Sequence, residues 1–219
     1  MTEGEAIGPV GGLRGLWGRL RHAERAGAAR REVARQLYEA AVGQARAPFW
    51  YRELAVPDTP EGRFEMIALH VALLLRRLRR EGALGQALGQ QLFDAMFVDL
   101  DGSLRELGVS DLSVGGYVKR LAGNLYARMD ALDRGLAARD GELEGGGPLD
   151  PMLRANVYHG VAPTEAQVAA LARWLTLQDR ALAGQKRAAL CSGTVVWLEP
   201  RAACAADAGA FGRDDGAVK

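Results

Sequence analysis

Apolar residues recur at alternating steps of three and four through every long periodic segment of this chain, and no segment shows a convincing alternation of two. The clearest stripe is Phe64, Ile67, Val71, Leu74 and Leu78, which marks a helix face turned toward a core. The pattern predicts an all-α fold, a single helical bundle domain of about six helices. The expected helices cover residues 25–45, 60–80, 84–107, 113–138, 150–159 and 164–183.

Several helix ends carry local signals. Thr59 followed by Pro60 predicts a capped helix start, and Thr164 with Gln167 fits a capping box. Ser113 is the expected cap of the fourth long helix, and Gly108 fits the stop of the helix before it.

The remaining segments are irregular. We expect an N-terminal amphipathic segment over 1–24, a helical domain over 25–200 and a disordered tail over 201–219. Within the domain, 46–58 is an aromatic connector and 141–148 a flexible link. Residues 194–199 are β-prone but isolated, so an extended segment packed on the bundle is predicted.

Length and composition narrow the class of protein. A chain of 219 residues with 48% hydrophobic residues supports one well-packed core, and a net charge of +1 gives no general attraction to DNA. The N-terminus lacks the pattern of a secretory signal, and the longest apolar run, 66–75, is well short of the roughly 20 residues that span a bilayer. These features predict a cytoplasmic protein that is at most peripheral to the inner membrane.

The residues that usually carry chemistry are not grouped. Asp94, Asp99, Asp101 and Glu106 share one predicted helix, but no Glu-x-x-His motif or calcium-loop pattern accompanies them. We therefore predict no catalytic residues, no metal, no cofactor and no small-molecule substrate, and expect these acids to pair with Arg105, Lys119 or Arg128. His70, on an apolar helix, is interpreted as an interior imidazole, with functional use as the alternative.

Two basic segments suggest contact with a membrane surface or the ribosome. One is the amphipathic stretch 11–22 and the other is the arginine-rich run 76–80. A packing helix and a solvated helix end are the respective alternatives. The candidate residues are Leu13, Arg14, Leu16, Trp17, Arg19, Leu20, Arg76, Arg77, Arg79 and Arg80.

Three adjacent aromatic residues, Phe49, Trp50 and Tyr51, stand in the connector. Three neighbours in a loop cannot all point inward, so exposed anchors for a partner are one interpretation. A cap over the end of the bundle is the other.

The stretch from Phe49 to Arg128 resembles the ubiquinol–cytochrome c chaperone family. The resemblance rests on V-P-D-T, G-R-F-E, the L-H pair, F-D-x-M-F-x-D-x-D, L-R-E-x-G-V-x-D and a later V-K-x-x-x-x-x-x-Y-x-R, in order and closely spaced. It extends more weakly through Trp197. Ala127, Leu132 and Gly102 depart from the pattern, which affects expected helix packing more than function.

The resemblance implies a helical, cofactor-free chaperone that supports assembly of ubiquinol–cytochrome c reductase (complex III) by binding newly made cytochrome b at the cytoplasmic membrane face. An apolar groove with a polar rim would suit that role. The residues expected to bind the client are Phe49, Trp50, Tyr51, Arg63, Phe64, Phe93, Asp94, Met96, Phe97, Asp101 and Lys119. A peripheral membrane or ribosome-docking module is the alternative, and an enzyme built on a helical bundle is a third.

Overall fold

The computed structural model describes residues 10–106, 111–138 and 149–204, and its regular elements are helices. Six of these have seven residues or more, which confirms the predicted all-α bundle of about six helices. They are α1 (Val10–Ala45), α3 (Pro60–Arg79), α4 (Gly82–Glu106), α5 (Asp111–Ala138), α6 (Asp150–Asn156) and α7 (Glu165–Gly184). Three single-turn helices accompany them: α2 (Pro48–Arg52), α8 (Arg187–Cys191) and α9 (Pro200–Cys204).

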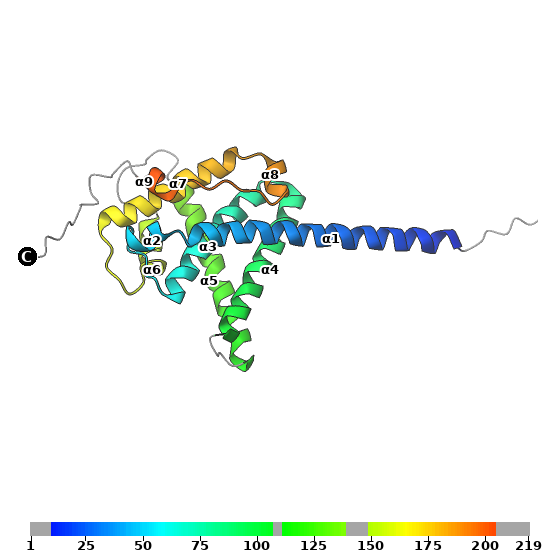
Figure 1. Ribbon diagram of the computed structural model, residues 1–219, viewed down its shortest axis with the longest axis horizontal. Coiled ribbons are helices and arrows are strands. Elements are labelled where there is room, and N and C mark those ends of the chain that lie inside the picture. Colours follow the sequence, from blue (N-terminus) through cyan, green and yellow to red (C-terminus); the bar gives the residue numbers. More distant parts are fainter. Residues whose placement is uncertain (1–9, 107–110, 139–148, 205–219) are drawn as a thin grey trace, which may run out of the picture.

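Helix α3 is the centre of the bundle. It contacts α1, α4, α5 and α7, and α1 also crosses α4 (Figure 1). Helices α4 and α5 run side by side away from the body, while α7 to α9 lie on the opposite side (Figure 1). The arrangement leaves α1, α3, α4 and α5 sharing one region beside α6.

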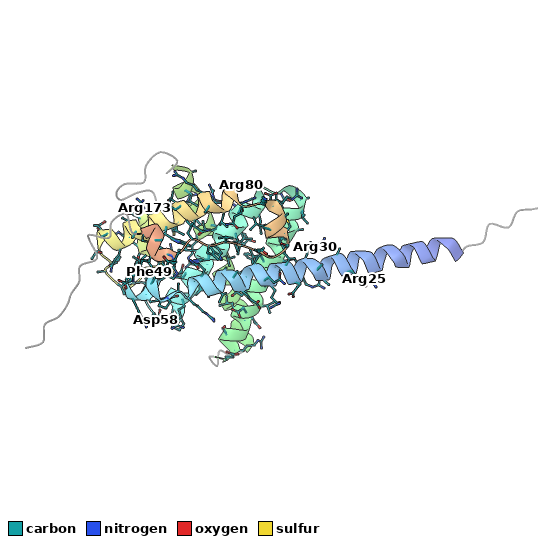
Figure 2. All side chains as sticks on the ribbon, turned by 45° about the horizontal axis from the view of Figure 1, so that its top comes forward. Arg25, Arg30, Phe49, Asp58, Arg80 and Arg173 are labelled. Atoms are coloured by element: carbon teal, nitrogen blue, oxygen red, sulfur yellow. The ribbon has the colours of Figure 1, made fainter. Side chains whose placement is uncertain are left out.

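Helix α1 is longer than expected. It begins at Val10 rather than near Arg25, and its N-terminal part projects beyond the other helices in both views (Figures 1 and 2). Among the α1 side chains that the structure describes, the first buried one is Ala34. No helix in the described ranges is both long enough and apolar enough to cross a bilayer.

The predicted helix starts at Thr59 and Thr164 are confirmed. Thr59 Oγ1 accepts a hydrogen bond of 3.1 Å from the Gly62 amide, and Thr164 and Gln167 form the reciprocal capping box. The predicted cap at Ser113 was wrong, since α5 begins at Asp111 and Ser113 lies inside this helix. Gly108 lies outside the described residues.

The core contains a cluster of aromatic rings around His70. The imidazole lies 4.9 Å from the ring of Trp174, 5.1 Å from Trp197 and 6.0 Å from Trp50, measured between centroids. His70 is fully buried, as predicted, and its Nδ1 lies 2.7 Å from the Met66 carbonyl oxygen. That oxygen can only accept, so Nδ1 carries the hydrogen, and in the neutral ring Nε2 carries none and has no partner among the described residues. Burial lowers the pKa of His70 to about 4.

Residues 194–199 form the predicted extended segment. Leu198 and Val196 donate their amides to Gln178 Oε1 and Gln185 Oε1, at 2.7 and 3.0 Å, so α7 and the residue that follows it hold this segment by side-chain hydrogen bonds. The expected disorder from residue 201 was wrong for its first residues. Pro200–Cys204 form α9, and Cys204 is buried against α7.

Candidate functional site

A groove opens where α1, α3, α4, α5 and α6 meet. Its volume is about 540 Å³, and its walls combine an apolar floor from α3 and α4 with charged side chains. Sites of this size and character are typical of binding proteins. The groove is lined by Tyr38, Arg46, Pro60, Glu61, Arg63, Phe64, Glu65, Ile67, Met96, Asp99, Leu100, Ser103, Arg128, Ala155, Asn156 and His159.

The inner wall of the groove holds a buried ion pair. Arg128 Nη2 lies 2.6 Å from Glu65 Oε1, and Arg128 Nε donates to Asn156 Oδ1 at 3.1 Å. Burial raises the pKa of Glu65 to about 7, because the nearby guanidinium offsets only part of the cost of removing the carboxylate from water. Arg128 Nη1 is buried and has no hydrogen-bond partner among the described residues. The hydrogen bonding of this pair is therefore incomplete.

A second polar contact ties α1 to α4 at the groove. The Tyr38 hydroxyl donates a hydrogen bond of 2.7 Å to Asp99 Oδ2. Burial, followed by the Asp99 carboxylate, raises the pKa of Tyr38 well above its ordinary value, so the hydroxyl keeps its proton. This contact fixes one edge of the groove.

Three residues expected from sequence lie in this groove. Phe64 is half-buried and Arg63 is exposed at the rim, where Asp58 pairs with it at 2.6 Å. Met96 also lines the groove but is only 1% exposed, so it contributes mainly to the core.

Two further expected residues, Phe93 and Phe97, lie on α4 outside the groove lining. Both are half-buried against the core, with their ring centroids 4.5 Å apart. Phe93 also stacks on Tyr126 of α5 at 5.3 Å. They form an apolar surface on the α4–α5 pair.

The aromatic connector caps the bundle. Its residues 48–52 form α2, and Trp50 points fully into the core, where its Nε1 donates to the Gln44 carbonyl at 2.8 Å. The prediction that Trp50 contacts a client is therefore corrected, because this side chain has no exposed surface. Phe49 and Tyr51 are half-buried, with the guanidinium of Arg201 over the first ring and that of Arg63 over the second. Figure 2 shows Phe49 and Asp58 at the end of the bundle away from the projecting part of α1.

The acids of α4 do not converge. Asp94 accepts from Gln90 Nε2 at 2.8 Å, and Asp101 pairs with Arg105 at 2.8 Å, one of the predicted partners. Arg128, another predicted partner, pairs with Glu65 instead. The side chain of Lys119 lies outside the described residues. In the part of the chain that the structure describes, no three His, Cys, Asp or Glu side chains are placed to hold a metal ion.

The arginine-rich end of α3 is largely engaged within the protein. Arg76 bridges Asp133 of α5 and Asp179 of α7, at 2.8 and 3.0 Å, and buried Arg77 donates to the carbonyls of Leu182 and Gln185. Membrane or ribosome contact by these two side chains was a wrong prediction, since they join α3 to its neighbours.

Two arginines of this run are exposed. They are Arg79, which pairs with Asp133, and Arg80. The side chains of the other basic segment, Leu13, Arg14, Leu16, Trp17, Arg19 and Leu20, lie outside the described part of the structure.

Sequence reasoning missed the polar partners in the groove, above all Tyr38, Glu65 and Asn156. A glutamate inside the apolar stretch FEMIALH is a detectable signal, because a carboxylate on a buried helix face needs a cationic partner. The identity of that partner was not readable, because it comes from a distant helix.

A helical bundle with an open groove of apolar floor and charged rim has the form of a protein-binding domain. The chain belongs to the ubiquinol–cytochrome c chaperone family, whose model, described as "Ubiquinol-cytochrome C chaperone", matches residues 52–197. The matched residues include α3 to α7 and most of the groove lining.

Two relatives extend the comparison. The chain resembles the crystal structure of the Cbp3 homolog from Brucella abortus with a TM-score of 0.71 and 31% identity, over 83% of this chain and 97% of that one. It is 22% identical over 108 residues to ubiquinol-cytochrome-c reductase complex assembly factor 1 of Xenopus laevis, which is 49% of this chain. The match spans about half of that relative, 54% of its length.

Proposed function

We propose that this protein is an assembly chaperone for ubiquinol–cytochrome c reductase and that its client is newly made cytochrome b. The observation that carries the proposal is the groove, because it combines an apolar floor with charged side chains inside the family-matched region. A chaperone for an apolar membrane protein needs such a surface to shield the client while the polar rim stays hydrated.

The proposed contact surface has two parts. The first is the groove with Arg63 and Phe64, and the second is the adjoining α4–α5 surface with Phe93 and Phe97. Asp94 and Asp101 are proposed for its polar rim, and the role of Lys119 stays a prediction because its side chain lies outside the described residues. Phe49 and Tyr51 are placed at its end, where the guanidinium of Arg63 lies 5.9 Å from the centroid of the Tyr51 ring.

The site of action in this proposal is the cytoplasmic face of the inner membrane, where the client would emerge. Docking to the membrane surface or the ribosome would place the chaperone there, and exposed Arg79 and Arg80 are the candidates on α3. Binding of that kind weakens as salt is raised, because exposed charges are screened.

Deletion of the gene tests the function. We expect the levels of cytochrome b and of assembled complex III to fall and a plasmid copy to restore them. Normal complex III in the deletion strain would overturn the proposal.

Capture of cytochrome b by tagged variants tests the surface. Phe64→Asp and Arg63→Glu are expected to reduce the cytochrome b that copurifies, and Arg63→Glu changes an exposed side chain that the fold tolerates. The matched control is Val98→Asp, on α4 and 74% exposed outside the groove. If both groove variants keep their helical circular dichroism and capture as much cytochrome b as the control, the groove is not the client site.

A further inference from the structure

The guanidinium of Arg128 is a charged group of the inner groove wall whose hydrogen bonding is incomplete. Of its three nitrogens, Nη2 contacts Glu65 and Nε contacts Asn156, while Nη1 is buried with no acceptor in the part of the chain that the structure describes. A buried cationic donor without an acceptor is costly, and native proteins usually complete such a group with an ordered water, an ion or a ligand.

Glu65 does not complete Arg128. Its contact to the guanidinium is through one oxygen, Oε1, where an arginine–carboxylate pair can form two parallel bonds. Burial also keeps the pKa of Glu65 near 7, so close to neutral pH the carboxyl does not fully neutralise its partner. The inner wall thus retains positive character.

Of the other charged side chains in the lining, Asp99 and Arg63 have partners, while Arg46 and Glu61 are exposed. Asp99 accepts the Tyr38 hydroxyl and Arg63 pairs with Asp58, which is not part of the lining. The surface around the pair is apolar, with Phe64, Ile67 and Leu100 among the lining residues. A ligand that fits these surroundings is apolar along most of its length and carries one strong hydrogen-bond acceptor for the Arg128 guanidinium.

We infer that the groove receives an apolar client segment that carries a carboxylate side chain, and that Arg128 binds this carboxylate. The inference rests on the proposed function and names the chemistry of the client at that site. The Arg128 side chain is 16% exposed and lines the groove, so a small outward shift presents its guanidinium to a ligand there. The client carboxylate then replaces Glu65 as the ionic partner or joins it.

Three matched peptides test the inference on the full chain. Each is a blocked nine-residue Leu/Ala peptide whose central residue is Glu, Gln or Lys, and binding is measured by titration at pH 7. We expect the Glu peptide to bind about tenfold tighter than the Gln peptide, the size of a charge-assisted hydrogen bond. Equal binding of the Glu and Gln peptides, or no binding of either, would overturn the inference. Tightest binding of the Lys peptide would also overturn it and assign the groove to a cationic segment.

Two variants separate binding from a structural role of the ion pair. Arg128→Gln is expected to abolish the preference for the Glu peptide, whereas Glu65→Gln removes the internal competitor and is expected to strengthen Glu-peptide binding several-fold. A purely structural pair predicts that both variants weaken all peptides alike, which would contradict the inference. Capture of cytochrome b by the wild-type chain is measured in parallel. If the wild-type chain captures cytochrome b but does not prefer the Glu peptide, only the Arg128 subsite is rejected. If the wild-type chain does not capture cytochrome b, the proposed function is rejected.

Discussion

Tyr38 on α1 and Asp99 on α4 are joined by a hydrogen bond of 2.7 Å between residues 61 positions apart. Because both side chains line the groove, this bond holds together two helices that shape it. A hydrogen bond from a hydroxyl to an exposed carboxylate contributes only modestly to the stability of the fold, because water competes for the carboxylate.

Tyr38→Phe should therefore lower the free energy of unfolding by about 1 kcal/mol. Urea denaturation followed by circular dichroism measures the change. Tyr126→Phe on exposed α5 surface is the control and should stay within about 0.5 kcal/mol of wild type. A Tyr38→Phe protein as stable as wild type would show that the bond adds nothing to the fold.

Glu65 should make the protein less stable as pH rises. Its pKa is about 7 in the folded protein against an ordinary value of 4.5, so the folded state binds more protons between these values. Its contribution to stability is complete below pH 4.5 and is lost as pH rises toward 7. The stability of wild type relative to Glu65→Gln should fall across this window, by at most about 1.4 kcal/mol per pH unit. A constant difference across the window would mean that Glu65 is ionised throughout.

His70 should make the protein less stable as pH falls, which is opposite to the effect of Glu65. Its pKa is about 4 in the folded protein against an ordinary value of 6.5, so the unfolded chain binds more protons between these values. Its contribution is complete above pH 6.5 and is lost as pH falls toward 4. Denaturation of His70→Gln at several pH values should show that the variant loses less stability than wild type on acidification. Parallel pH profiles for the two proteins would contradict the assignment.

Gly62 is required for the start of α3. A Cβ atom at this position would lie 2.1 Å from the Pro57 carbonyl oxygen, and backbone cannot yield as a flexible side chain can. Gly62→Ala should destabilise the protein by about 1–3 kcal/mol, the usual cost of overpacking. Gly43→Ala is the matched control, because nothing lies within 4 Å of its added Cβ, and it should raise stability by about 0.5–1 kcal/mol. Thermal unfolding of the two variants should therefore shift in opposite directions.

The bridge through Arg76 should matter more than a surface ion pair. Arg76→Met removes the part-buried cation shared by Asp133 and Asp179, although Asp133 keeps its pair with Arg79, and should cost about 2–4 kcal/mol of unfolding free energy. Arg35→Met, which removes exposed pairs with Glu32 and Glu39 on α1, should change it by less than about 1 kcal/mol. Similar losses in the two variants by urea denaturation would show that burial adds no strength to the Arg76 bridge.

Local features of the fold were readable from the sequence, whereas the groove was not. The caps at Thr59 and Thr164 depend on residues three positions away, so the sequence displays both partners together. The contacts of Glu65 and Tyr38 depend on which helix faces become neighbours, and that is decided by packing. The direction of Trp50 likewise follows from the single turn of α2, which the run of three aromatics did not reveal.

The arrangement around His70 also gives the protein a built-in optical reporter. Three of its four tryptophans, Trp50, Trp174 and Trp197, surround one imidazole, although they come from α2, α7 and the segment after α8. Their fluorescence emission therefore reports whether the segment 194–199 stays packed against His70 of α3. The groove lining contains no tryptophan. Ligand binding and loosening of the core can therefore be measured separately in one sample. Binding is followed by the fluorescence of a label on the client, and loosening of the core by the tryptophan fluorescence of the protein.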